Sequence, residues 1–133
     1  AGFMSYVCIA ERIAGFIANY SKHPLELIAM IAIFSAFASS IIDNVVLITS
    51  SIPIISSLIS SGINGFPLWW ALLFGGCYGG NITQIGSTAN IVALGVLEKR
   101  KHHYIKPKEW IPVGLIAGIV PTLIGLILLI LQI

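Results

Sequence analysis

The chain has 133 residues, of which 57% are hydrophobic and 9% are charged, and its formal net charge is +2. Soluble domains carry about 25% charged residues, so this composition excludes an ordinary soluble domain and predicts one membrane domain over residues 1–133. The positive charge comes from a single loop, which argues against nucleic-acid binding and makes the lipid bilayer the first expected partner.

The N-terminal part of the chain predicts two segments. Residues 1–10 are apolar and open without a basic leader, so we expect the end of a helix that begins upstream. Residues 11–24 combine charged side chains with Ile13, Phe16 and Ile17 at helical spacing. That pattern predicts a short helix in the membrane interface, and a simple loop between two spans is the alternative.

Residues 25–59 form two apolar arms around a polar cluster that contains Asp43 and Asn44. Each arm is about 14 residues long, or roughly 21 Å of helix at 1.5 Å per residue. That length is short of a hydrocarbon core of about 30 Å. Two short arms with a polar tip predict a re-entrant hairpin rather than two complete spans.

Residues 68–97 predict a discontinuous helix. The run starts with Trp69 and Trp70, which suit a membrane interface, and is interrupted between Gly75 and Asn90. Each glycine costs a helix about 1 kcal/mol relative to alanine. Irregular backbone at membrane depth is tolerated where it is buried in protein or lines a watery cavity. The interruption therefore predicts a binding segment, although close helix packing would also explain its first glycines.

The last part of the chain sets the expected orientation. Residues 98–109 hold five of the seven Lys and Arg residues, and the positive-inside rule places this loop in the cytoplasm. Residues 110–133 carry no formal charge and predict a final complete span. The C-terminus and both ends of the hairpin are then expected outside.

Asp43 is the first candidate for a functional residue. A carboxylate inside a membrane span costs about 2.5–3.5 kcal/mol even on the lenient insertion scale, which favours a role in binding an ion or substrate. Asp is also a favoured residue at the start of a helix, so a simple cap is the alternative. Both roles are compatible, because a capped helix N-terminus can itself bind ions.

Three stretches together resemble the ion transporter superfamily: Asp43-Asn-Val, Leu68-Trp-Trp-Ala-Leu, and Gly79-Gly-Asn-Ile-Thr-Gln-Ile-Gly-Ser-Thr-Ala-Asn-Ile. That superfamily includes arsenite permeases, a class of sodium/proton antiporters, and citrate or divalent-anion symporters. The resemblance implies an all-α, polytopic membrane protein in a prokaryotic plasma membrane. It matches the second of two inverted repeats, so the chain would be half of a transporter, either as part of a longer protein or as a half-size subunit.

The resemblance also implies where the site lies and what it needs. Substrate or ion binding is expected at Asp43, Asn44, Asn81, Thr83, Ser87, Thr88 and Asn90, with structural glycines at Gly79, Gly80 and Gly86. A bound Na⁺ would lie near Asp43, Asn44 and Asn90. No cofactor is expected, and the coupling ion would be Na⁺ or H⁺. The resemblance also implies a homodimer. Separately, it implies that the other half of the site comes from the N-terminal repeat, which is missing from this sequence.

The leading functional hypothesis is an ion-coupled secondary transporter of a small inorganic or organic anion, similar to an arsenite permease, working by symport or antiport. A Na⁺/H⁺ antiporter, in which Asp43 alternates between proton and sodium, is the alternative. An intramembrane aspartyl enzyme needs two carboxylates that share a proton, whereas residues 27–97 contain only Asp43. A structural membrane subunit is the distant alternative and would not need the polar residues after Gly79.

Overall fold

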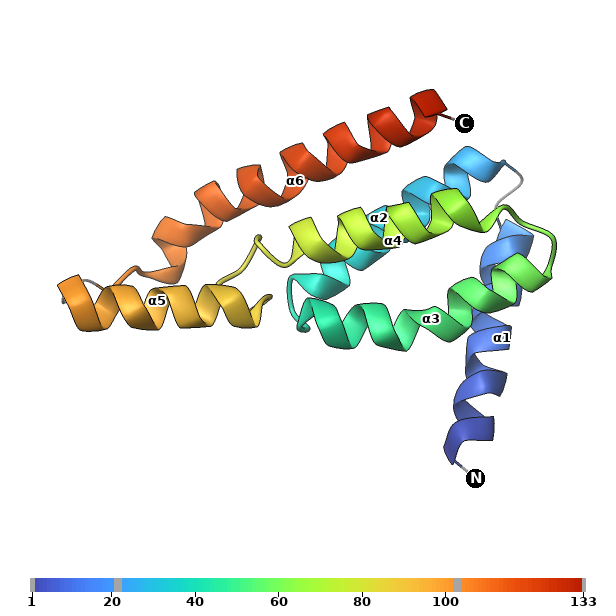
Figure 1. Ribbon diagram of the computed structural model, residues 1–133, viewed down its shortest axis with the longest axis horizontal. Coiled ribbons are helices and arrows are strands. Elements are labelled where there is room, and N and C mark those ends of the chain that lie inside the picture. The colour runs from blue at the N-terminus through green and yellow to red at the C-terminus, as the bar shows by residue number, and fades with distance from the viewer. Residues whose placement is uncertain (1, 21–22, 102–103, 133) are drawn as a thin grey trace.

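The computed structural model describes residues 2–20, 23–101 and 104–132, which form six helices joined by short connections (Figure 1). In chain order these are α1 (Gly2–Tyr20), α2 (Pro24–Ser39), α3 (Asn44–Ser60), α4 (Gly65–Gly79), α5 (Thr88–Lys101) and α6 (Pro107–Gln132). The described residues contain no strand. The predicted all-α class is therefore confirmed.

Helix α1 runs without a break across the boundary that the sequence predicts between residues 10 and 11. Glu11 and Arg12 are exposed, and both residue types are good helix formers, so the change in polarity does not interrupt the helix. Ala14 is buried, and α1 packs against α3. An interfacial position for residues 11–24 stays a prediction, and residues 21–22 lie outside the described part.

Helices α2 and α3 match the two arms predicted over 25–59, with bounds that differ by one residue at each end. Their re-entrant position in the membrane stays a prediction. Pro24 begins α2, a position where its fixed φ suits a helix and its missing N–H is not needed. Asp43 is the N-cap of α3, and its side chain accepts a hydrogen bond from the Val45 N–H at 3.0 Å. The turn between the helices is therefore set by local sequence signals.

Helices α2 and α4 lie side by side and run in the same direction (Figure 1). A methyl group on Gly75 would collide with the Ala32 carbonyl oxygen, and one on Gly79 would collide with the Ala36 backbone. The two glycines thus let the helix backbones touch. The buried Ser39 hydroxyl adds a hydrogen bond to the Gly76 carbonyl at 2.5 Å. This contact brings the C-terminal ends of both helices to the same place.

The apolar core is built around the N-terminal and middle turns of α2 and α4, away from the C-terminal ends that meet. It is built by α2, α3, α4 and α6, with Ala14 of α1 at its edge, and its most buried members include Ile28, Ala32, Ile55, Leu58, Leu68 and Ala71. Outside it, large apolar side chains face outward, among them Phe34 at 69% exposure and Phe37 at 68%. Contiguous apolar surface of this kind indicates contact with lipid or with further protein.

Among the described residues, α6 is the one helix long and apolar enough to cross a membrane alone, over Pro107–Leu131. It begins at Pro107 rather than at residue 110, the predicted start of the final span. Helices α2 and α3 are apolar but shorter. The predicted discontinuous helix corresponds to α4 and α5, which are separated by the non-helical residues 80–87, hereafter the irregular segment.

Gly79→Ala should destabilise the protein by about 1–3 kcal/mol, the usual cost of overpacking a tight contact, because the new methyl group would meet the Ala36 backbone. Gly95→Ala is the matched control, since a methyl group on Gly95 meets no atom within 4 Å. Thermal unfolding of the purified full-length protein measures both variants. Equal stability of the two would contradict the α2–α4 contact.

Candidate functional site

Four helix ends meet at the polar tip of the α2–α3 pair. Helices α2 and α4 end there, and α3 and α5 begin there, with the starts of α3 and α5 facing each other (Figure 1). Helix N-termini carry partial positive charge and helix C-termini partial negative charge. Such a meeting point can hold an anion against exposed N–H groups and a cation against exposed carbonyls.

Asp43 joins the two helices that begin at this point. Its carboxylate accepts hydrogen bonds from the Val45 N–H of α3 at 3.0 Å and from the Thr88 N–H of α5 at 3.2 Å. The Thr88 hydroxyl donates a further hydrogen bond to the same carboxylate. Asp43 is half-buried and Thr88 is exposed, so the group is accessible from one side. One carboxylate therefore caps two helices that are 45 residues apart in the sequence.

Asn90, near the start of α5, holds together two parts of the irregular segment through hydrogen bonds from its side chain. Its side-chain N–H₂ donates to the Gly80 carbonyl at 3.0 Å and to the Thr83 carbonyl at 3.2 Å. The Thr83 hydroxyl in turn donates to the carbonyl of Ser40, at the end of α2. These bonds give partners to carbonyls that no continuing helix can pair. The polar side chains of 80–90 thus hold the irregular backbone against the tip of the α2–α3 pair.

The glycines of the irregular segment allow carbonyl groups to converge. A methyl group on Gly86 would lie 2.7 Å from the Gly80 oxygen and 2.8 Å from the Ser39 oxygen, and one on Gly80 would lie 3.0 Å from the Gly86 oxygen. Any larger residue at Gly86 would push the ends of α2 and α4 away from the segment. Closely spaced carbonyl oxygens at helix C-termini favour cations.

The structure brings most of the predicted site residues to this meeting point. Asp43 is hydrogen-bonded to Thr88, and Asn90 separately to the Thr83 carbonyl. Asn44 is half-buried as the first residue of α3. The Ser87 hydroxyl accepts a hydrogen bond from the Ala89 N–H at 3.3 Å, at the start of α5. Asn81 is half-buried in the irregular segment. A role in binding stays a prediction for all of them.

Sequence reasoning missed three residues that join the network through their side chains. Ser39 bonds to Gly76, as described, and Gln84 donates to the Ile105 carbonyl at 3.0 Å. Trp110 donates its indole N–H to the Asn81 carbonyl at 3.1 Å. Ser39 and Gln84 could have been found as polar residues in apolar surroundings. Nothing in the sequence pattern distinguishes Trp110 from an interface tryptophan.

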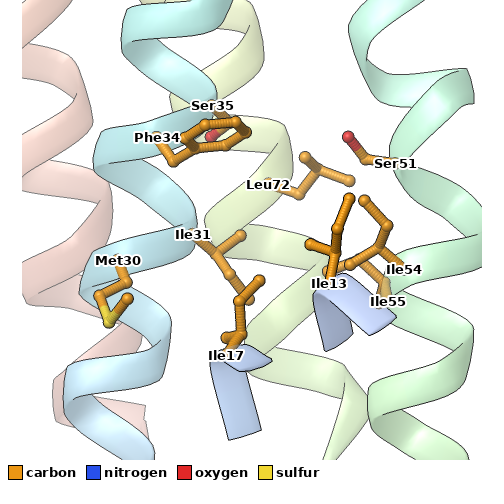
Figure 2. Close-up of a pocket in the computed structure, with 10 residues that line it drawn as sticks. All are labelled: Ile13, Ile17, Met30, Ile31, Phe34, Ser35, Ser51, Ile54, Ile55 and Leu72. Carbon is orange, nitrogen blue, oxygen red and sulfur yellow. The ribbon is translucent and has the colours of Figure 1, made fainter. Parts of the chain in front are cut away.

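An apolar cavity of about 250 Å³ lies elsewhere, between α1, α2, α3 and α4 (Figure 2). Its lining is apolar except for Ser35 and Ser51. Their hydroxyls donate to the carbonyls of Ala32 at 3.1 Å and Leu47 at 2.8 Å, each within its own helix. The cavity therefore presents no free polar group with which to orient a charged ligand.

A second cavity, of about 290 Å³, lies beside the irregular segment and is lined by Gln84 and Ile85 together with residues of α5 and the 104–105 connection. Glu98 is its charged lining residue. Within the described residues, no group of three or more His, Cys, Asp or Glu side chains is placed to hold a metal ion. Cation binding at the tip would therefore depend on carbonyl and amide oxygens together with Asp43.

These features define a class of helical membrane protein. In it, a polar, non-helical break between two helices lies beside the turn that joins two other apolar helices. The chain matches the citrate transporter family over residues 1–132 and belongs to that family. The predicted resemblance to the ion transporter superfamily is confirmed. Membership of a transporter family makes the chain part of an integral membrane protein and not an enzyme.

Several known proteins are similar to parts of this chain. The chain is 39% identical over 80 residues to the P protein of Homo sapiens, an alignment covering 58% of this chain and 10% of that protein. It is 38% identical over 77 residues to a 46 kDa membrane protein of Mycobacterium leprae, covering 56% and 18%. It is 39% identical over 69 residues to an uncharacterized transporter of Mycobacterium tuberculosis, covering 49% and 16%.

The aligned part of the chain thus spans less than a fifth of the length of each of these three relatives. No solved structure matches it.

Asp43→Ala should destabilise the protein more than Asn64→Ala does. Loss of an N-cap costs about 0.5–2 kcal/mol, and Asp43 caps both α3 and α5, whereas Asn64 caps α4 alone through the Phe66 N–H at 3.1 Å. Denaturant or thermal unfolding of the full-length protein compares the two variants. Equal losses would contradict the double cap.

Proposed function

We propose that this chain supplies half of the substrate site of a secondary transporter that moves a small anion across the membrane together with Na⁺ or H⁺. The observation that carries the proposal is the meeting of four helix ends around Asp43. Helix N-termini favour anions, and helix C-termini and unwound carbonyls favour cations. A site with both kinds of end suits a substrate and a coupling ion of opposite charge.

Membership of the citrate transporter family favours a carboxylate anion as the substrate class. Residues 27–97 contain one formal charge, Asp43, and it is negative. An anion bound beside it would need compensation from a cation or a proton. Asp43, Asn44 and Asn90 would provide oxygen ligands for Na⁺ next to the converging carbonyls, since hard cations prefer oxygen. Asn81, Thr83, Ser87 and Thr88 would contact the substrate or shape its site.

The membrane arrangement that goes with this proposal has α2 and α3 as a re-entrant hairpin and α4–α5 as a discontinuous helix. Helices of 16 and 17 residues are short of the roughly 20 residues that a full span needs. Helix α6 would cross the bilayer completely, with residues 98–109, which include the end of α5 and the start of α6, in the cytoplasm and the C-terminus outside. The other half-site would come from an inverted repeat beyond this chain, and a homodimer stays a prediction.

Asp43→Asn should abolish transport while leaving the protein folded, because the amide oxygen of Asn can still cap α3 at the Val45 N–H, whereas its N–H₂ cannot accept from Thr88 and the side chain carries no charge. Uptake of radiolabelled citrate into proteoliposomes, driven by a Na⁺ gradient or by a pH gradient, measures the effect. Asn64→Ala, which removes a cap outside the site, is the control and should transport normally. Undiminished uptake by Asp43→Asn would remove Asp43 from the site.

A Na⁺/H⁺ antiporter is the second candidate, and the same carboxylate favours it. Asp43 is the only carboxylic acid in residues 27–97, so it could exchange a proton for Na⁺ without any anion. Proteoliposomes that contain a pH-sensitive dye and no citrate separate the two functions. We expect no sodium-driven proton movement until citrate is added. Proton flux driven by sodium alone would replace the anion proposal with the antiporter.

A further inference from the structure

One face of α6 lies directly against the irregular segment. Trp110, Gly114 and Gly118 are spaced four residues apart, so they share this face. The Trp110 indole N–H donates to the Asn81 carbonyl at 3.1 Å. A methyl group on Gly114 would lie 2.6 Å from the Asn81 oxygen and 2.6 Å from the Ile82 oxygen. Helix α6 therefore touches the backbone of the segment and not only its side chains.

The Asn81 carbonyl needs a donor because of where it lies. Helix α4 ends at Gly79, so no continuing helix supplies an N–H to the carbonyls that follow. In apolar surroundings an unpaired carbonyl costs several kcal/mol. Asn90 of α5 pairs with the carbonyls of Gly80 and Thr83. Trp110 is the corresponding donor from α6. It pairs with the carbonyl of Asn81, which lies between Gly80 and Thr83 in the sequence.

Gly114 makes that bond possible. Its missing side chain leaves room for both carbonyl oxygens and for the indole, because a methyl group there would lie 2.9 Å from the Trp110 Nε1 atom. Gly118 extends the contact by one turn, since a methyl group on it would lie 3.0 Å from the Tyr78 oxygen. The Gln84 side chain adds a second tie, to the Ile105 carbonyl just before α6. Contacts from α6 and from the connection before it thus hold the backbone of the segment in place.

We infer that Trp110 is a positioning residue of the transport site: its N–H fixes the Asn81 carbonyl and thereby sets how the irregular segment presents its polar groups. Trp110 does not contact the substrate. The inference rests on the proposed transport function for its kinetic consequence, although the hydrogen bond itself can be tested without substrate. The start of α6 would then influence the affinity for substrate or coupling ion, although its sequence is mostly apolar.

Trp110→Phe in the full-length transporter keeps the ring and removes only the N–H. The half-saturating concentration of citrate, or of the coupling cation at fixed citrate, should rise about fivefold, the effect of one net hydrogen bond. The maximal rate and the abundance should stay within about twofold of wild type. Gly114→Ala, which crowds the same carbonyl, should shift affinity in the same direction. Trp69→Phe, a half-exposed tryptophan of α4, is the control and should change neither value.

Hydrogen–deuterium exchange of residues 80–87 in the purified protein tests the bond independently of transport. Trp110→Phe should speed exchange there, whereas Trp69→Phe should not. Unchanged exchange, or a fall in maximal rate with unchanged half-saturation, would overturn the positioning role. Absence of citrate uptake by the wild-type protein would instead count against the proposed substrate, and the exchange result would still decide the role of Trp110.

Discussion

The structure depends on pairing the backbone groups that become exposed where helices stop in apolar surroundings. Each helix end leaves N–H or C=O groups without a partner inside the helix, and four such ends meet at one place in this chain. Side chains supply the missing partners. Asp43 accepts from the starts of α3 and α5, and Asn90 and Trp110 donate to carbonyls beyond the end of α4. The break in the helix is therefore maintained by specific bonds and is not a flexible interruption.

Packing and polarity act together at this point. The glycines of α4 let it approach α2 closely enough for both C-terminal ends to share one location, and Gly86 keeps space for their carbonyls. If any of these glycines carried a side chain, the helix ends would separate and the hydrogen bonds between them would lengthen. The site proposed for transport is thus coupled to the α2–α4 contact, which is made by Gly75 and Gly79 and by the hydrogen bond from Ser39 to Gly76. Helix α6 adds a third support through Trp110 and Gly114.

Much of the fold could be predicted because its signals are local. The polar cluster at Asp43 and the glycines after Gly75 act on neighbouring residues, and they predicted the turn between α2 and α3 and the break between α4 and α5 to within a few residues. The family was also predicted, from three short stretches, and is confirmed. Local signals could not show that Asp43 pairs with Thr88 or that Trp110 pairs with Asn81. Those bonds join segments 45 and 29 residues apart, and they depend on how the helices pack. The continuity of α1 was missed because polarity was interpreted as a boundary.

The central claim is that substrate and coupling ion bind where the starts of α3 and α5 face each other. A cryo-electron microscopy structure of the full-length transporter with citrate and Na⁺ tests it most directly. We predict density for the bound species within hydrogen-bonding or coordination distance of Asp43 and of the irregular segment, with the Trp110–Asn81 bond retained. Citrate density elsewhere, with Asp43 still bonded to Val45 and Thr88 and no ion beside it, would contradict the account.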